Sequence, residues 1–323
     1  MKSLDKNRIA LITAIVAEPE FAGITAGLLE KDEHLTDALK VIFEQNFDHA
    51  KLIFCGGTSL SKGHALIERM SEDADIKIVL SDEANGWASN RQRNYLGQVV
   101  REGISKSLLA IGLKEDASER RSQNGNRYMH SQWTYERAFG EVAGLRPNLQ
   151  IELTVRTPVL KTENLTMESL SNRLTKRSGG KFNAETVSIA ETQAEKVLSF
   201  LRRFGQHRAG QMTREWDTAL VRHIYDVHCI VSLHPELLEL SASAFSSLVE
   251  GDRAELGKQH PDYMDDPKGV LENALAQMRS DVQTQSEYDN NLLPLIYGDF
   301  RPTFDDSFAS FERAAKTLLG TIS

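Results

Sequence analysis

Hydrophobic and polar positions recur along the first half of the chain with two different periods. Residues 25–46 and 94–111 carry large aliphatic side chains at helical spacing, which predicts two amphipathic helices. Residues 51–55 and 76–80 are short apolar runs, which predict buried strands. Residues 149–155 alternate strictly between apolar and polar side chains, which predicts a strand with one polar face. Strands therefore alternate with helices in this part of the chain.

The pattern changes in the second half. Asn124-Gly125 still predicts a tight hairpin that leads into a strand over residues 127–137. From about residue 188 onward, the hydrophobic positions recur at helical spacing, apart from breaks near prolines. We therefore expect an α+β fold in which a domain with a mixed sheet occupies residues 1–185 and a mainly helical domain occupies residues 186–323.

Composition narrows the class of protein. The 323 residues include 38 Lys and Arg against 46 Asp and Glu, a net charge of −8, and 40% are hydrophobic, which is typical of a globular chain and excludes collagen, coiled coils and wholesale disorder. Such a charge argues against a uniformly basic protein that coats nucleic acid. Two cysteines form neither a disulfide framework nor a zinc pair, so we expect a reducing, cytoplasmic setting. No apolar stretch approaches the ~20 residues that cross a bilayer, so no membrane association is expected.

The segment that follows the first apolar strand has the features of a phosphate-binding turn. Gly56 and Gly57 interrupt the strand and allow close backbone approach. Thr58 and Ser59 come next, at the start of a predicted helix over residues 58–70. Hydroxyl groups and free amides at the N-terminus of a helix suit a phosphate, because the positive end of the helix dipole lies there.

Carboxylates follow this turn at the spacing of a metal site. Asp73 and Asp75 enter the second apolar strand, where residues i and i+2 share one face. Glu152, on the polar face of residues 149–155, is the candidate for a third carboxylate from a neighbouring strand. Three such oxygen ligands can hold divalent metal ions beside a phosphate. A glycine turn alone usually binds nothing, and an Asp-x-Asp is usually solvated, so the order of these features carries the prediction.

In this order the features resemble the minimal nucleotidyltransferases of the DNA polymerase β superfamily. Within that group the chain is similar to the AbiEii/AbiGii toxin family, which includes the MenT toxins. The resemblance spans roughly residues 30–230. The residues that carry it are Gly56-Gly57-Thr58-Ser59-Leu60-Ser61-Lys62, Arg69 and Ser71-Glu72-Asp73-Ala74-Asp75, with Glu30-Lys31-Asp32 upstream and the segments around Lys196 and Arg222-His223-Ile224-Tyr225-Asp226 downstream.

The resemblance implies a fold, a chemistry and a biological setting. The fold is a polymerase β-like nucleotidyltransferase core followed by a helical C-terminal half. The cofactor is Mg²⁺ and the co-substrate is an NTP. The family motif implies that the residues from Gly56 to Ser59, together with Lys62, bind the NTP. Members act in toxin–antitoxin or phage-defence systems, which implies an antitoxin protein as a partner. Some members add nucleotides to the 3′ end of tRNA.

Two residues of the helical half need a separate argument. Lys196 lies beside the apolar stripe of its helix and, taken alone, belongs to a solvated face. With the resemblance, we predict that its ammonium holds a phosphate of the NTP and offsets charge that develops during transfer. Asp226 pairs at i, i+4 with Arg222, but such a pair contributes only about 0.2–0.5 kcal/mol and does not explain an acid in an apolar helix. We predict that Asp226 positions Lys196, acts as a base or otherwise supports the site.

The sequence thus predicts a nucleotidyltransferase toxin that transfers a nucleotide from an NTP to an acceptor hydroxyl by a two-metal mechanism, with release of pyrophosphate. The expected acceptor is the tRNA 3′ end. The basic segments 173–181 and 202–214 are expected to contact its phosphates, because they flank the helix that carries Lys196. Two alternatives stay open: nucleotidyl transfer to a protein or small molecule, and a non-catalytic NTP-binding regulator that acts through a partner protein.

Overall fold

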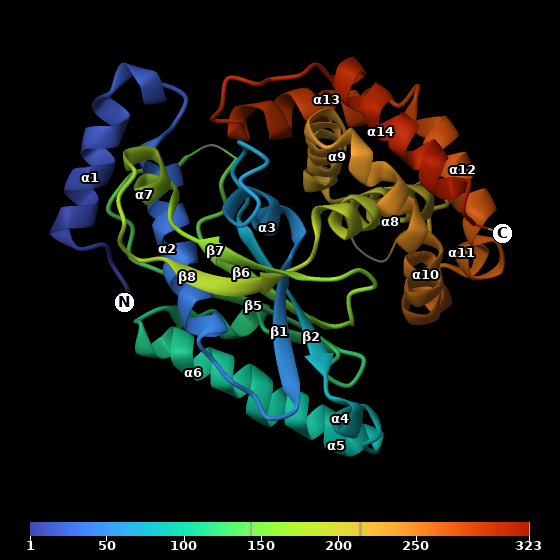
Figure 1. Cartoon of the computed structure of the whole chain (residues 1–323), viewed down its shortest axis with the longest axis horizontal. Coiled ribbons are helices and arrows are strands. Elements are labelled where there is room, and N and C mark those ends of the chain that lie inside the picture. Colours follow the sequence, from blue (N-terminus) through green and yellow to red (C-terminus); the bar gives the residue numbers. More distant parts are fainter. Residues whose placement is uncertain (143, 213–214, 323) are drawn as a thin grey trace. The chain divides into compact units, whose positions relative to one another are not determined.

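The computed structural model describes residues 1–142, 144–212 and 215–322. Within these residues the chain forms two compact units (Figure 1). Unit 1 contains Met1–Ala65, Met70–Pro158 and Thr162–Val187. Unit 2 contains Leu66–Arg69, Val159–Lys161 and the described residues from Ser188 onward. Two short pieces of the N-terminal half thus belong to the helical unit.

Unit 1 is built on one mixed sheet, in which the strand order is β3-β5-β6-β2-β1-β8-β7 and β4 pairs with β5. β2 lies between β1, to which it is antiparallel, and β6, to which it is parallel. β4 and β5 form the hairpin that Asn124-Gly125 predicts. The strands are β1 (Ala50–Cys55), β2 (Asp73–Leu80), β3 (Lys114–Glu115), β4 (Arg121–Gln123), β5 (Tyr128–Thr134), β6 (Leu149–Val155), β7 (Glu163–Met167) and β8 (Phe182–Thr186).

Helices cover the apolar face of this sheet. Ala74, Ile76 and Ile78 of β2 are buried on that face, and they belong to one hydrophobic core with residues of α2 and α6. The predicted helix over 94–111 is present, but its first part, Tyr95–Arg101, is π-helical. The helices of unit 1 are α1 (Lys6–Ala17), α2 (Ala26–Phe43), α3 (Gly56–Lys62), α4 (Asp82–Asn85), α5 (Ser89–Asn94), α6 (Glu102–Ala110) and α7 (Leu170–Thr175). The mixed α+β fold expected from the sequence is confirmed.

Unit 2 is helical, with α8 at its centre. Ser188 precedes α8, and its side chain caps the helix by accepting a hydrogen bond from the Glu191 amide. It packs against α9, α10 and α12, and α14 packs against α9. The helices of unit 2 are α8 (Ile189–Arg208), α9 (Arg222–Leu233), α10 (Leu238–Leu256), α11 (Pro261–Asp265), α12 (Pro267–Met278), α13 (Val282–Glu287) and α14 (Phe304–Leu319).

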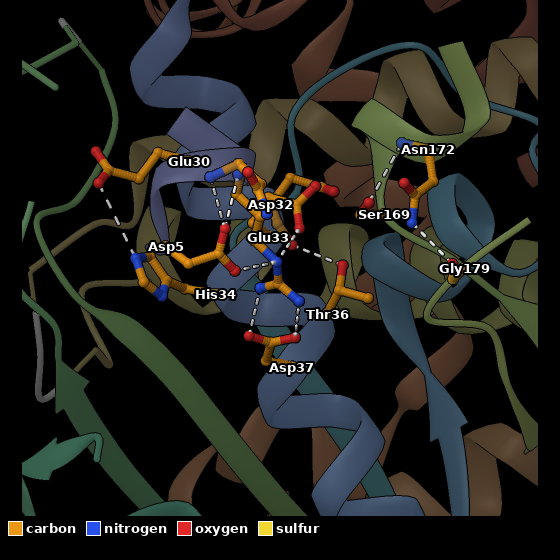
Figure 2. Close-up of polar contacts among 12 residues, drawn as sticks. Asp5, Glu30, Asp32, Glu33, His34, Thr36, Asp37, Ser169, Asn172 and Gly179 are labelled. Carbon is orange, nitrogen blue, oxygen red and sulfur yellow. Dashed lines mark hydrogen bonds and ion pairs between the residues drawn. The ribbon is translucent and has the colours of Figure 1, made fainter. Parts of the chain in front are cut away.

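α2 buries a run of polar side chains that its amphipathic pattern does not anticipate. These residues are Glu30, Lys31, Asp32, Glu33, His34 and Thr36, all buried. Figure 2 shows Glu30, Asp32, Glu33, His34 and Thr36 along the helix. Each carboxylate has a partner: the Glu30 carboxylate, for example, accepts hydrogen bonds from the amides of Ala138 and Phe139 at 2.6 and 3.1 Å. Buried charges persist only when they are paired in this way, so these residues fix loops and neighbouring helices to α2.

His34 is the exception within this run. Its ring is fully buried and packs against Tyr135, with 4.1 Å between ring centroids and 30° between the ring planes. Neither ring nitrogen has a hydrogen-bond partner among the described residues, and the Glu30 carboxylate lies 4.0 Å from Nε2. Burial lowers the pKa of His34 to about 3, with a smaller contribution from the positive charge of Lys2. His34 is therefore neutral in the folded protein at neutral pH.

We expect the stability of the protein to fall with acidification because of His34. The unfolded chain takes up a proton near pH 6.5 and the folded chain only near pH 3, so stability decreases between these values. The loss due to this residue is about 2 kcal/mol at pH 5 relative to pH 7.5. Urea unfolding of the wild type and of His34→Gln at both pH values measures it. The variant should lose this component, whereas a His207→Gln control keeps it. An identical pH dependence in wild type and His34→Gln would contradict the assignment.

Candidate active site

The glycine turn and the aspartate strand meet at the end of the β1–β2 pair. Cys55, the last residue of β1, lies opposite Asp75 in the antiparallel register. Gly56 follows with φ +77°, in the left-handed region that favours glycine. A Cβ at this position would overlap the Asp75 carboxylate. Two features therefore require glycine at position 56: its backbone conformation and the close approach of Asp75. The predicted proximity of the glycine turn and the carboxylate is present.

The helix after this turn is shorter than the predicted helix over 58–70. α3 ends at Lys62, and Ala65 has φ +50°, which is incompatible with a continuing helix. Leu66–Arg69 instead belongs to unit 2, where Arg69 forms a β-bridge with Ile296. The prediction of a helix over 58–70 was therefore wrong. Helical spacing of hydrophobic residues gives no information about a β-bridge to Ile296, more than two hundred residues away.

The two hydroxyls of the turn stabilise it internally. Ser59 Oγ donates to the Gly56 carbonyl at 2.8 Å. Thr58 Oγ1 bonds to the Asp73 carbonyl and, at 2.8 Å, to Ser71 Oγ. Both residues are buried. Thr58 therefore ties the start of α3 to the first residue of β2, which holds the turn and the aspartates in one arrangement.

The structure ties the ammonium of Lys62 to α2. Lys62 Nζ lies 2.6 Å from Asp32 Oδ1 and 2.6 Å from Thr36 Oγ1, and the side chain is buried. The other oxygen of Asp32 accepts a hydrogen bond from the Leu170 amide at 2.6 Å. Lys62 thus anchors the end of α3 to α2.

The three candidate carboxylates share one face of the sheet. Asp73 and Asp75 are i and i+2 in β2, and Glu152 of β6 lies opposite Asp75 in the parallel register. Neighbouring strands are about 4.8 Å apart, so the side chains of Asp75 and Glu152 project from adjacent positions on this face. Such oxygen donors suit Mg²⁺. Among the described residues, however, no group of three or more Asp, Glu, His or Cys side chains is gathered closely enough to hold a metal ion.

Asp73 has a partner that the sequence did not indicate. Arg146 Nη1 lies 2.9 Å from Asp73 Oδ1 and 2.7 Å from Gln150 Oε1. The backbone of Arg146 is held in turn by Glu72, whose Oε2 accepts a hydrogen bond from the Arg146 amide at 2.7 Å. Arg146 lies in the loop before β6, a segment with no periodic pattern, so only the contact itself identifies it.

In unit 2, Lys196 and Asp226 form the predicted pair, and Arg69 joins them. Lys196 Nζ lies 2.7 Å from Asp226 Oδ2. Arg69 donates to both Asp226 oxygens, from Nε at 2.7 Å and from Nη2 at 2.6 Å. All three side chains are buried, and Asp226 is fully enclosed. Arg69, 157 positions upstream, contacts both oxygens of the Asp226 carboxylate, and i, i+4 spacing cannot suggest such a partner.

The charges of this triad are unequal. Burial raises the pKa of Asp226, but the charges and hydrogen bonds of Arg69 and Lys196 outweigh that effect, so its pKa lies well below the usual value. Burial, assisted by the charge of Lys196, lowers the pKa of the neighbouring His223 well below its usual value, so His223 is neutral. Two cations and one anion therefore meet at Asp226, and the excess positive charge suits a phosphate.

The basic segments differ in how far their charges are available. Arg202, Arg203 and Arg208 pair with aspartates at 2.6, 3.2 and 3.6 Å, and Arg214 lies outside the described residues. In the other segment, Arg173 donates to the Ser61 carbonyl at 2.8 Å. Lys176 and Arg177 are exposed in the loop that follows, which Asn172 stabilises by donating to the Gly179 carbonyl at 2.8 Å, while Lys181 pairs with Glu168 at 3.2 Å. That loop is the stronger candidate for contacts with an anionic polymer.

Comparisons with known proteins give a family and a structural relative for most of this chain. A family model described as nucleotidyl transferase AbiEii toxin, type IV toxin–antitoxin system, matches residues 37–310. Among solved structures the chain is similar to MenT4, a nucleotidyltransferase toxin from Mycobacterium tuberculosis H37Rv, with a TM-score of 0.55 and 18% identity over 98% of this chain and 90% of that chain. At this identity the likeness concerns the fold. A comparison with curated protein sequences gives no match.

No helix among the described residues has the length and apolar character that a membrane span requires.

The triad around Asp226 yields a stability prediction. Asp226→Asn leaves two buried cations without their anion and should destabilise unit 2 by about 3–5 kcal/mol. Arg69→Met should also destabilise it, and the double variant should cost at least about 2 kcal/mol less than the sum, because the fork is already absent. Urea unfolding of the four proteins in the cycle measures this coupling. Arg279→Met, which removes an exposed pair with Glu312, is the control and should cost less than about 1 kcal/mol. Additive losses would contradict a coupled triad.

Proposed function

Because the chain belongs to the AbiEii nucleotidyltransferase toxin family, we propose that this enzyme of a toxin–antitoxin system transfers a nucleotide from an NTP to the 3′ end of tRNA with the help of Mg²⁺. The observation that carries the proposal is the row of carboxylates on β2 and β6 beside the glycine turn. The family implies a cognate antitoxin as the protein partner.

Asp73, Asp75 and Glu152 are the residues that would hold Mg²⁺. All three offer hard oxygen ligands on one polar sheet face, which is the chemistry that this ion prefers. When bound, Mg²⁺ would neutralise charge on the triphosphate and polarise the reacting phosphate. The opposite face of β2 is packed into the core of unit 1, so the backbone that positions these carboxylates is rigid.

The glycine turn supports binding of the triphosphate. Gly56 and Gly57 carry no side chain, so their amides can approach a phosphate closely, and Ser59 keeps the turn closed through its bond to the Gly56 carbonyl. Lys62, anchored on Asp32, keeps α3 in place. In unit 2, Lys196 has the charge that suits a phosphate, and Asp226 orients its ammonium. Asp226 is thus proposed as a positioning residue.

The chain's contribution to the reaction is positioning and charge stabilisation. The acceptor hydroxyl attacks the α-phosphorus in line while pyrophosphate departs. The buried network around the turn fixes the donor before the reaction, which removes an entropic cost. A carboxylate of the row can accept the proton of the attacking hydroxyl, and Glu152 is suited to this because it is next to Asp75. The ammonium of Lys196 offsets negative charge as pyrophosphate leaves.

An RNA acceptor is supported by the exposed basic loop of unit 1. The chain has a net charge of −8, so attraction of RNA requires a local basic surface. Lys176 and Arg177 supply one in the loop that Asn172 holds in place. Contacts from such a loop are made to phosphates, so they position an acceptor stem without reading its sequence.

The first test is incubation of the protein with each labelled NTP and total cellular RNA. We expect label in RNA of tRNA size with one or a few NTPs, and none with Asp75→Asn, because that change removes a charged ligand while retaining the shape of the side chain. The variant should keep the unfolding midpoint of the wild type. Label in protein or in a small molecule would overturn the tRNA acceptor, and full turnover by Asp75→Asn would overturn the metal site.

The second test addresses the basic loop. The double variant Lys176→Glu, Arg177→Glu should weaken binding of tRNA and reduce the slope of log affinity against log salt by about one to two. A matched double variant, Lys106→Glu with Lys114→Glu, makes the same change in net charge at exposed positions elsewhere in unit 1. It should retain most of the affinity and the slope. Equal effects of both double variants would show that net charge, and not this loop, governs binding.

A further inference from the structure

The positively charged side chain of Arg146 already contacts the carboxylate of Asp73. Its Nη1 contacts Asp73 Oδ1 at 2.9 Å, and the same nitrogen contacts Gln150 Oε1 at 2.7 Å. Asp73 is the first of the two aspartates proposed as metal ligands, and Gln150 is its neighbour across the parallel strands. The guanidinium thus lies on an oxygen that a metal ion would also require.

The backbone of Arg146 is held by a buried ion pair. Lys31 Nζ lies 2.5 Å from Glu72 Oε2, and each residue is only 1% exposed. Lys31 also donates to the Arg146 carbonyl at 2.8 Å, and Glu72 accepts from the Arg146 amide at 2.7 Å. Because Glu72 directly precedes Asp73, the same pair fixes both the arginine and the carboxylate that it contacts. The contact is therefore built into the fold.

The side chain of Arg146 is less constrained than its backbone. It is 35% exposed, and that of Asp73 is 30% exposed. Arg69 and Asp226, by contrast, are both buried. A long, partly solvated side chain on a fixed backbone can exchange one anionic partner for another at small cost.

We propose that Arg146 is a placeholder cation. Its guanidinium neutralises Asp73 before a divalent ion binds, and the side chain then moves so that the guanidinium contacts the triphosphate. The inference rests on the proposed function and adds a residue to it. A guanidinium and a divalent cation on one carboxylate repel each other, so binding of the ion favours departure of Arg146. The planar fork of arginine matches the oxygens of a phosphate, which makes the arriving triphosphate its natural next partner.

This exchange predicts opposite shifts in two affinities. Arg146→Gln removes the competitor, so binding of Mn²⁺ to the nucleotide-free protein should tighten by about two- to fivefold, the equivalent of a partly exposed charge pair. The same variant loses a contact with the triphosphate, so the KM for NTP should rise by about tenfold or more. A purely structural role would weaken both or change neither.

The experiment measures free Mn²⁺ by electron paramagnetic resonance and NTP kinetics on the full-length protein. Arg146→Lys keeps the charge but not the fork, so its Mn²⁺ affinity should match the wild type while its KM for NTP lies between those of wild type and Arg146→Gln. Arg137→Gln is the matched control, since it removes an arginine that pairs with Glu141 at 3.1 Å. It should leave both quantities unchanged.

The outcomes separate this inference from the function on which it rests. Mn²⁺ binding that Asp73→Asn with Asp75→Asn abolishes establishes the metal site itself. If wild-type binding is missing or survives that double change, the proposed metal site is wrong and the inference fails with it. If the site is established but Arg146→Gln binds Mn²⁺ no more tightly than the wild type, the placeholder role is overturned alone. An unchanged KM for NTP in Arg146→Gln would overturn the proposed contact between Arg146 and the triphosphate.

Discussion

Two consecutive side chains of α2 hold the two ends of the segment that joins the glycine turn to β2. Asp32 binds the ammonium of Lys62 at the end of α3, and Lys31 binds Glu72 directly before the aspartates. Both pairs are buried, so neither solvent nor salt weakens them appreciably. The arrangement of the turn, the carboxylate row and Arg146 depends on these two ion pairs.

Such pairs are costly, which explains why they occur where precise positioning is needed. Removing two charges from water costs several kcal/mol per ion, and mutual attraction offsets this only when the remaining hydrogen-bonding groups are also satisfied. Asp32 meets the condition through Lys62 and the Leu170 amide, and Glu72 through Lys31 and the Arg146 amide. Apolar residues in their place would stabilise unit 1 at least as well, but they would not fix α3, α7 and the Arg146 loop relative to β2.

Two arginine–aspartate contacts illustrate how burial separates a structural from an exchangeable interaction. Arg69 and Asp226 are buried and joined by two hydrogen bonds, so their separation would leave enclosed charges. Arg146 and Asp73 are in contact but partly exposed, so water or another ion can replace either partner. The residue types are the same in both cases, and the surrounding solvent decides what each contact can do.

The sequence by itself determined the local parts of this protein. Short apolar runs identified β1 and the apolar part of β2, strict alternation identified β6, and Asn124-Gly125 identified the β4–β5 hairpin. The order of glycine turn and Asp-x-Asp indicated the chemistry, because residues i and i+2 of a strand must share a face whatever the rest of the fold does. Each of these inferences concerns residues within a few positions of one another.

Only the tertiary structure decided which distant residues meet. α3 ends at Lys62, and Arg69 further along pairs with Ile296, a partner about which periodicity carries no information. Lys62 belongs to a phosphate-binding motif in the sequence, and in the structure its ammonium forms an ion pair with Asp32, 30 positions upstream. Arg146 belongs to no pattern and is defined by its contact with Asp73, 73 positions away. Propensity and periodicity are set by neighbours along the chain, whereas the partner of a buried charge is set by whichever charged group the packed core brings to it.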